Sequence, residues 1–157
     1  MSPAYGDKRF QSRATPAGAG SEASVLVVAH RTADSPELVH VMRERAAEGA
    51  AAFTLLVPAS GHGVVFGSDP QAATLEAGRR IRDGLRVMRR AGLTVEGRLG
   101  DPDPMAAVHD AVNFGTFDEV IVSTLPAGFS RWLGVDLPRR VAWATGLEVR
   151  QVTASGR

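Results

Sequence analysis

Strand-type and helix-type segments alternate strictly along this chain, and that order constrains its fold more than any other feature. Short runs typical of strands are found at 24–29, 53–57, 93–99, 117–122 and 147–152, and an amphipathic helical pattern separates each run from the next. A repeated strand–helix–strand order produces parallel strands joined by right-handed crossovers. The sequence therefore predicts an α/β fold, in which a parallel sheet is covered by helices on both faces.

Proline and glycine mark where the four predicted helices begin and end. A proline stands in the first turn of each helix, at Pro36, Pro70, Pro104 and Pro138. Gly49, Gly92 and Gly146 can end three of the helices, and Asp136 is expected to cap the last one. In the helix after Pro70, one buried apolar stripe is predicted, formed by Leu75, Gly78, Ile81, Leu85 and Met88.

Length and composition fit a single globular domain. The chain has 157 residues, close to the roughly 150 residues of one domain, and 44% of them are apolar. Residues 1–23 are rich in Ser, Ala, Gly and Pro, and they offer too little apolar surface to offset the entropy of ordering. We therefore expect a disordered tail at 1–23 followed by a domain at 24–154. A docked arm held by Tyr5 and Phe10 is the alternative.

Charge and cysteine content exclude several classes of function. The chain has no cysteine, which excludes disulfides, Cys-type zinc sites and thiol catalysis. Its 18 basic and 17 acidic residues give a net charge of +1, which predicts no global attraction to nucleic acid or to an anionic membrane. The sequence also has neither an apolar run that could span a membrane nor a secretory signal, so a cytoplasmic location is expected.

Several stretches resemble the universal stress protein family. They are VLVVAH at 25–30, GDPDPMAAV at 100–108, DEVIVST at 118–124 and the stretch from Ser130 to Val152. The resemblance covers Val25–Val152 and implies a five-stranded sheet in the order 3-2-1-4-5, commonly dimeric through the last strand. Many members of the family bind ATP or AMP at the carboxyl ends of strands one and four, which is the topological switch point of that order.

The nucleotide motif of that family, Gly-x-x-Gly followed after nine residues by Gly-Ser or Gly-Thr, is not intact. Starting at Ser123, its glycine positions fall on Ser123, Pro126 and Asp136, and no register keeps more than one glycine. Glycines in this motif let backbone N–H groups close on phosphate, whereas proline has no N–H and an aspartate would repel phosphate. His30 also replaces the acidic residue that the family carries after the first strand. These residues predict weak ATP binding or none.

The candidate ligand-binding residues follow the ends of the first, third and fourth strands. His30 either contacts a ligand at the switch point or bonds nearby backbone as a loop histidine. Arg131 either holds an anion through its guanidinium or is a surface residue, and Ser130 either binds the ligand or caps a helix. The full candidate set is His30, Arg31, Thr32, Gly100, Ser123, Thr124, Gly128, Ser130 and Arg131.

No arrangement of residues in the sequence indicates catalysis or a metal site. The four histidines form no i,i+4 pair, and neither a Ser-His-Asp order nor a paired-carboxylate spacing stands out. His62, in the predicted loop Pro58–Pro70, either reaches over the switch point or is exposed at the loop tip. We expect no metal and no enzyme activity. An enzyme that uses His30 as acid or base is an alternative.

The segment Arg79–Arg90 is strongly basic. It contains six arginines against Asp83 alone, a local charge of +5. Such a run is typical of a solvated helix face, and the alternatives are a docking face for RNA, for an acidic partner or for a membrane surface. Because no aromatic residues interleave with the arginines, base stacking is not supported.

Together these features predict a non-catalytic binding or regulatory domain. We expect a homodimer through the C-terminal strand, because the half-polar run 147–152 suits a sheet edge. The expected ligand is a small polar molecule or a protein partner, with no cofactor, no nucleic acid and no membrane. The alternatives are an ATP- or AMP-binding stress protein with a divergent phosphate loop, and an accessory subunit of a larger assembly.

Overall fold

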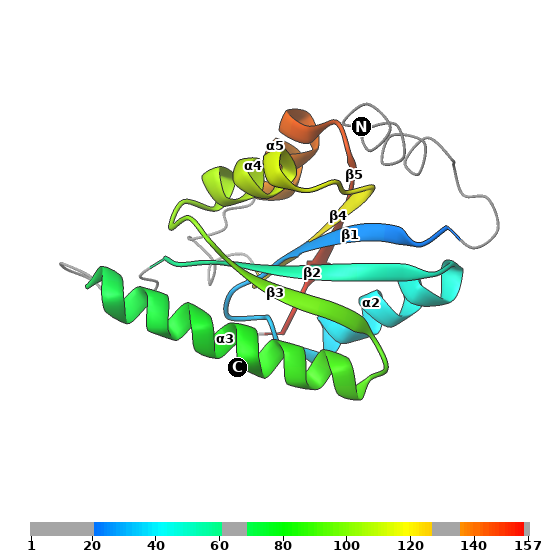
Figure 1. The fold of residues 1–157 in the computed structure, drawn as a ribbon, viewed down its shortest axis with the longest axis horizontal. Helices are drawn as coiled ribbons and strands as arrows, with labels where there is room; N and C mark the ends of the chain where they lie inside the picture. The colour runs from blue at the N-terminus through cyan, green and yellow to red at the C-terminus, as the bar shows by residue number, and fades with distance from the viewer. Residues whose placement is uncertain (1–20, 61–68, 127–135, 156–157) are drawn as a thin grey trace, which may run out of the picture.

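The computed structural model describes residues 21–60, 69–126 and 136–155, and most of the predicted tail 1–23 lies outside them. Within the described residues, strands and helices alternate as predicted (Figure 1). The elements are β1 (Ala23–Val28), α2 (Pro36–Glu48), β2 (Ala51–Pro58), α3 (Pro70–Arg90), β3 (Thr94–Gly100), α4 (Pro104–Phe114), β4 (Glu119–Thr124), α5 (Leu137–Thr145) and β5 (Glu148–Thr153).

The five strands form one parallel sheet in the order β3-β2-β1-β4-β5, which confirms the predicted fold class and strand order. Strand β1 lies at the centre, where Val25 is opposite Phe53 of β2 and Glu119 of β4. The strand order reverses between β1 and β4, so the carboxyl ends of these two strands form the switch point. Strand β5 ends the sheet, as its half-polar pattern predicted.

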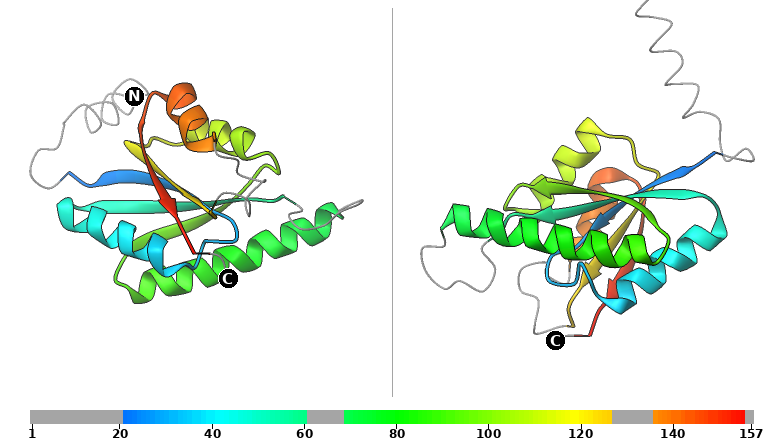
Figure 2. Two further views of the ribbon diagram at one scale, coloured as in Figure 1. Left: turned by 180° about the vertical axis from the view of Figure 1, so that it is seen from behind. Right: turned by 60° about the horizontal axis from the view of Figure 1, so that its bottom comes forward.

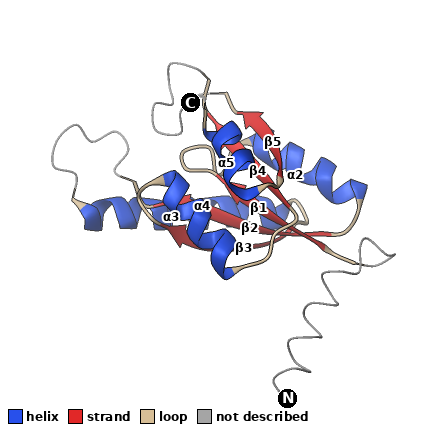
Figure 3. Ribbon diagram, turned by 90° about the horizontal axis from the view of Figure 1, so that it is seen from above, coloured by secondary structure: helices blue, strands red, loops and turns tan. Residues whose placement is uncertain are grey.

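Two layers of helices cover the sheet. Helices α4 and α5 lie on one face, and α2 and α3 lie on the other (Figures 1 and 2). Seen from above, α4 and α5 cross the sheet side by side (Figure 3), and they are in contact with each other. None of the helices in the described part of the chain is both long and apolar enough to cross a membrane.

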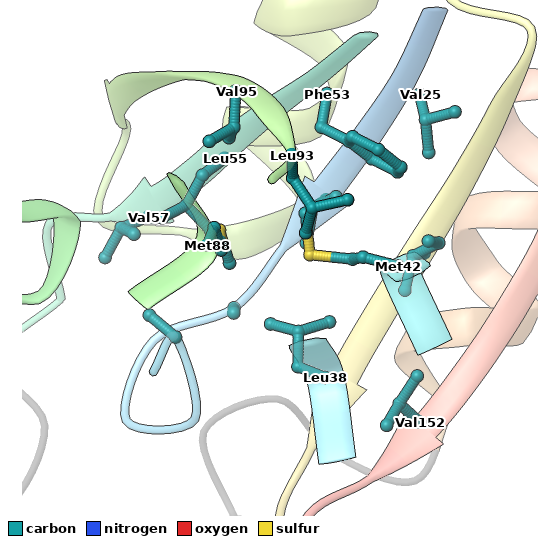
Figure 4. Packing of buried hydrophobic residues seen from close by; sticks show 14 of the residues in the cluster. Val25, Leu38, Met42, Phe53, Leu55, Val57, Met88, Leu93, Val95 and Val152 are labelled. Atoms are coloured by element: carbon teal, nitrogen blue, oxygen red, sulfur yellow. The ribbon is translucent and has the colours of Figure 1, made fainter. Parts of the chain in front are cut away.

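Alternate residues of the central strands supply two separate hydrophobic cores. Val25 and Val27 of β1 face α2 and α3 and pack with Phe53, Leu55, Met42 and Met88 (Figure 4). The residues between them, Leu26 and Val28, face α4 and α5 and pack with Val120, Val122, Met105, Val108 and Val141. This burial on both faces explains why β1 and β4 are continuous apolar runs.

The inward face of α3 differs from the predicted apolar stripe. Leu75 is 70% exposed, and the buried positions of the helix are Ala73, Ala77, Gly84 and Met88. A Cβ on Gly84 would lie only 2.8 Å from Leu55 Cδ2 and 2.9 Å from the Ala33 carbonyl oxygen. The prediction holds at Met88, which is fully buried, and at Ile81 and Leu85, which pack against the core, and it is wrong at Leu75. It also misses Ala73, Ala77 and Gly84, the small residues that α3 turns toward the sheet.

The helix ends agree with the predictions except at Asp136. Ser35, Asp69 and Asp103 each cap a helix, because their side-chain oxygens accept N–H bonds from the first turn. Asp136 occupies the N-cap position of α5 but makes no side-chain capping bond, because its backbone is already helical (φ −89°, ψ −6°) rather than extended. Gly146 ends α5 in the left-handed region, with φ at 71°.

Candidate functional site

Buried polar side chains gather where β1 and β4 end. His30 and Ser123 are completely buried, and Thr32 and Thr124 are each 4% exposed. His30 and Thr32 follow β1, whereas Ser123 and Thr124 are the last two residues of β4. Polar groups are costly to bury without partners. A cluster of four buried polar side chains therefore distinguishes the switch point from the mostly apolar core of the sheet.

A hydrogen bond joins the two sides of the switch point. The Thr32 Oγ1 and Ser123 Oγ atoms lie 2.6 Å apart, and either hydroxyl can be the donor. Only one proton is used in such a bond, so the accepting hydroxyl keeps its own proton for another partner. Thr124 Oγ1 donates to the Val152 carbonyl oxygen at 3.5 Å and accepts from Gln151 Nε2 at 3.4 Å, which connects β4 to β5.

A pocket of about 190 Å³ opens beside this bond, on the side of α2 and α3, and we call it the switch-point pocket. Its walls come from the segment after β1, the start of α2, the middle of α3 and the residues after β4 and β5. The lining residues are Arg31, Thr32, Asp34, Ser35, Pro36, Arg80, Leu125 and Ser155. Thr32 thus contacts both the pocket and the buried hydroxyl of Ser123.

The charge of the switch-point pocket is mainly positive. Arg31 and Arg80 contribute two guanidinium groups, against the single carboxylate of Asp34. Arg80 is anchored by Glu76, whose carboxylate lies 3.4 Å from its Nη2. The N-terminus of α2 also lies here, but the Leu38 N–H already donates to Ser35 Oγ at 3.2 Å. The arginines therefore supply most of the attraction that the pocket offers to an anion.

The chain after β5 is tied to α2 at the edge of the pocket. The backbone N–H and the hydroxyl of Ser155 both donate to Glu37 Oε2, at 3.2 Å and 2.5 Å. These two bonds hold Ser155 in the pocket wall. The contact therefore fixes the path of the chain after β5 relative to α2.

The structure brings together only part of the predicted candidate set. Arg31 and Thr32 line the switch-point pocket, and Ser123 contacts Thr32. His30 is buried behind them and is not a lining residue. Gly100 lies two strands away at the end of β3, where its carbonyl oxygen accepts from the Ala59 N–H. Gly128, Ser130, Arg131 and His62 lie outside the described residues.

Sequence reasoning misses four polar residues of the pocket, which are Asp34, Ser35, Arg80 and Ser155. Asp34 and Ser35 directly precede Pro36, which marks a predicted helix start, and Arg80 is one member of the basic segment Arg79–Arg90. Ser155 is absent from the candidate set, although it follows the last strand closely and the carboxyl ends of all parallel strands share one edge of the sheet. The shared edge of the strands could therefore have pointed to Ser155. No sequence pattern pointed to Arg80, because its place in the pocket depends on how α3 is rotated about its axis.

No group of three or more His, Asp or Glu side chains that could hold a metal is found among residues 21–60, 69–126 and 136–155. The chemistry that the described site supports is hydrogen bonding and charge pairing. Two arginines and three hydroxyl-bearing residues line one small volume, a composition that suits phosphate or carboxylate oxygens.

Comparison with solved structures identifies the fold. The chain is similar to a universal stress protein from Burkholderia pseudomallei (TM-score 0.61, 16% identity, covering 85% of this chain and 98% of that one). It is also similar to the Archaeoglobus fulgidus universal stress protein in complex with dAMP (TM-score 0.58, 15% identity, 83% and 97% covered). A third is an Arabidopsis thaliana universal stress protein family protein with AMP bound (TM-score 0.56, 14% identity, 84% and 92% covered).

No protein-family model and no curated protein matches the sequence. At identities of 14–16% the likeness concerns the backbone arrangement and not the ligand. The strand order, the crossover helices and these structural matches agree, so this chain has the fold of the universal stress proteins.

Proposed function

We propose that this chain is a non-catalytic, universal stress protein-like domain that binds a small anion in the switch-point pocket. The observation that carries the proposal is the convergence of Arg31 and Arg80, from separate elements, on a pocket of about 190 Å³. Guanidinium groups present fixed N–H donors that match carboxylate and phosphate oxygens. The hydroxyls of Thr32, Ser35 and Ser155 add neutral hydrogen-bonding groups to the same walls.

The size of the pocket favours a small ligand. Sites for drug-sized ligands usually measure about 300–1,000 Å³, and the switch-point pocket measures about 190 Å³. A phosphate, a small carboxylate or a short sugar phosphate fits this volume better than a complete nucleotide. Asp34, an exposed residue of the lining, would disfavour a long chain of phosphates.

The absence of enzyme activity is part of the proposal. The switch-point pocket brings together arginines, hydroxyls and one carboxylate, and none of these pairs has the form of a nucleophile held by a base and an orienting group. The hydroxyl–carboxylate contact of Ser155 with Glu37 is a structural tie. A cytoplasmic, homodimeric protein with a regulatory role accords with this chemistry.

Binding of AMP is the second candidate. It is favoured by two solved structures with this fold, one in complex with dAMP and one with AMP bound. A phosphate of AMP could pair with Arg31 and Arg80 without the missing glycines. This candidate requires the rest of the nucleotide to lie outside the small pocket.

A thermal-shift titration separates the two candidates. Freshly purified protein is first denatured and examined by mass spectrometry for a co-purified small molecule. The wild type is then titrated with phosphate, glucose 6-phosphate, citrate and AMP, alongside Arg31→Gln and Arg80→Gln. Arg139→Gln is the matched control, because this exposed arginine lies on α5, across the sheet from the pocket.

The proposal predicts stabilisation by at least one small anion, lost in Arg31→Gln and Arg80→Gln and kept in Arg139→Gln. A ligand at one hundred times its dissociation constant adds about 2.7 kcal/mol, which is several degrees in Tm for a domain of this size. Stabilisation by AMP alone, with the same dependence on the arginines, would support the second candidate. A flat response to every compound would contradict both.

A further inference from the structure

The outer face of α3 carries a row of exposed arginines that the switch-point pocket does not use. Arg79, Arg82, Arg86 and Arg90 recur every three or four residues, so they share the side of the helix opposite the buried Ala77 and Met88. We call these four residues the arginine stripe. From Arg79 to Arg90 it extends for about 16 Å at 1.5 Å per residue. Leu75, 70% exposed, continues the same row by one turn.

The arginine stripe is poorly neutralised. In the described part of the chain, the ion pairs of α3 join Arg80 to Glu76 and Arg86 to Asp83, and the second of these is 3.7 Å long. Arg79, Arg82 and Arg90 take part in no ion pair there. Because Arg79–Arg90 carries +5 and the whole chain +1, the rest of the chain carries −4.

This arrangement lowers the stability of the helix. Arg82 and Arg86, and again Arg86 and Arg90, are like charges four residues apart, a spacing at which charges repel. Arginine in the last turn is favoured by the helix dipole, which accounts for Arg90 but not for Arg79 or Arg82. No contact within the described part of the chain offsets most of this repulsion. Such an unfavourable arrangement of charges suggests that the arginines bind another molecule.

A groove with apolar walls lies next to the arginine stripe. Val87, 36% exposed, is on the helix surface between Asp83 and Arg90, and it also lines an open groove of about 690 Å³ between α3 and α2. The opposite wall comes from α2 and the residue before its N-cap. Its apolar members are Pro36, Val39 and Ala47, and its polar members are Asp34, His40, Arg43 and Glu44. Helices α2 and α3 cover the same face of the sheet, so the groove and the stripe lie on one side of the molecule (Figures 1 and 2).

From the stripe and the groove together, we infer that this face docks an acidic amphipathic helix of a partner protein. The apolar side of that helix lies in the groove against Val39 and Val87, and its carboxylates pair with the arginine stripe, where Arg–carboxylate contacts are bidentate. The α2 side of the groove carries Asp34 and Glu44 as well as Arg43, so it offers carboxylates no net attraction. The acidic edge of the helix therefore lies over α3, where the arginine stripe is.

Nucleic acid fits this face less well than a protein does. A phosphate backbone gains nothing from the apolar walls of the groove, whereas the apolar side of an amphipathic helix can cover them. Helix α3 also has no aromatic residue on which a base could stack.

An unbiased selection tests the inference with the full chain. A phage-displayed library of random peptides, each about 16 residues or roughly 24 Å as a helix, is selected on the wild type and on Arg82→Glu/Arg86→Glu. The matched control is Arg139→Glu/Arg140→Glu, which reverses two exposed charges on α5. Enriched peptides are then synthesised, and their dissociation constants are measured by fluorescence anisotropy at low and physiological salt, beside an RNA and a DNA oligonucleotide.

We expect the wild type and the α5 control to enrich acidic peptides with apolar residues at helical spacing. The stripe variant should bind these peptides about tenfold more weakly or worse, and salt should weaken the wild-type complex. The Tm of the stripe variant should stay close to that of the wild type, because the attraction between a carboxylate at position 86 and Arg90 offsets the loss of the Arg86–Asp83 ion pair. No acidic enrichment, equal binding by the stripe variant, or tighter stripe-dependent binding of an oligonucleotide would overturn the inference. The switch-point pocket is unchanged in all these variants.

Discussion

The hydroxyl of Thr32 lies 2.6 Å from the hydroxyl of Ser123 and joins the segment after β1 to the end of β4. Ser123 is completely buried, whereas Thr32 lines the switch-point pocket. If Ser123 donates, Thr32 has a proton to offer an anion, and if Thr32 donates, its oxygen can accept from a ligand. The buried Ser123 hydroxyl therefore determines whether Thr32 can donate or accept a hydrogen bond in the pocket.

Replacing Ser123 by alanine should lower stability. Thr32 then loses its buried partner, at a cost of about 1–3 kcal/mol, which corresponds to roughly 2–4 °C in Tm per kcal/mol for a domain of this size. Thermal unfolding of Ser123→Ala measures the loss. The exposed Thr94 of β3 provides the control, since Thr94→Ala should change stability by no more than about 0.5 kcal/mol. Equal Tm values for the two variants would contradict this account of the hydroxyl pair.

Two glycines of α3 should respond to alanine with opposite signs. At Gly84 a Cβ would meet the Ala33 carbonyl oxygen at 2.9 Å, and a backbone atom cannot move aside cheaply, so Gly84→Ala should cost about 1–3 kcal/mol. At Gly78 nothing lies within 4 Å of the added Cβ, so Gly78→Ala should stabilise the helix by about 0.5–1 kcal/mol. Urea unfolding of both variants measures the difference, and a neutral Gly84→Ala would show that α3 is less closely packed.

The two aspartates that precede α4 and α5 should also differ. Asp103 Oδ2 accepts the Ala106 N–H at 3.0 Å, so Asp103→Ala should lose about 0.5–2 kcal/mol of stability. Asp136 makes no such bond, and Asp136→Ala should be close to neutral. Chemical denaturation of the pair, under the same conditions, distinguishes a capping aspartate from one that only occupies the position. An equal loss for both would mean that Asp136 stabilises α5 by other means.

The sequence predicted the sheet, its helices and a candidate site at the edge of the sheet where the switch-point pocket lies. Those features follow from local patterns, such as the apolar run of β1 and the prolines that begin each helix, and from the resemblance that implied the strand order. The composition of the pocket did not follow in the same way. Arg80 reaches it because Ala73, Ala77 and Gly84 let α3 pack closely on the sheet. Ser155 reaches it because Glu37 holds the chain after β5. Both depend on contacts between distant segments, which periodicity does not reveal.

A homodimer through β5 remains a prediction that solution measurements can decide. β5 pairs only with β4 among the described strands, so one edge presents unpaired backbone groups to a second copy. Light scattering should give twice the 16.6 kDa chain mass at micromolar concentration. Gln151→Lys, near the middle of β5, should lower the dimer fraction by placing like charges across the pair, whereas Thr94→Lys on the edge strand β3 should not. A wild-type mass near 16.6 kDa would contradict the prediction.

Complete nucleotides should bind weakly or not at all, and ATP should not be hydrolysed. At two of the positions where the family motif has glycine, this chain has Ser123, which is buried within β4, and Asp136, which begins α5. A buried strand residue cannot offer its N–H to phosphate, and the negative charge of Asp136 at the start of α5 would repel a phosphate there.

The test is a thermal-shift titration with millimolar ATP and magnesium. A nucleotide at one hundred times its dissociation constant would add about 2.7 kcal/mol and raise the Tm by several degrees, and we expect a rise of less than about 1 °C. Asp136→Gly is the informative variant, because it restores one glycine and removes the opposing charge. A gain of ATP stabilisation in Asp136→Gly would identify that carboxylate as the barrier, whereas strong stabilisation of the wild type would contradict the prediction.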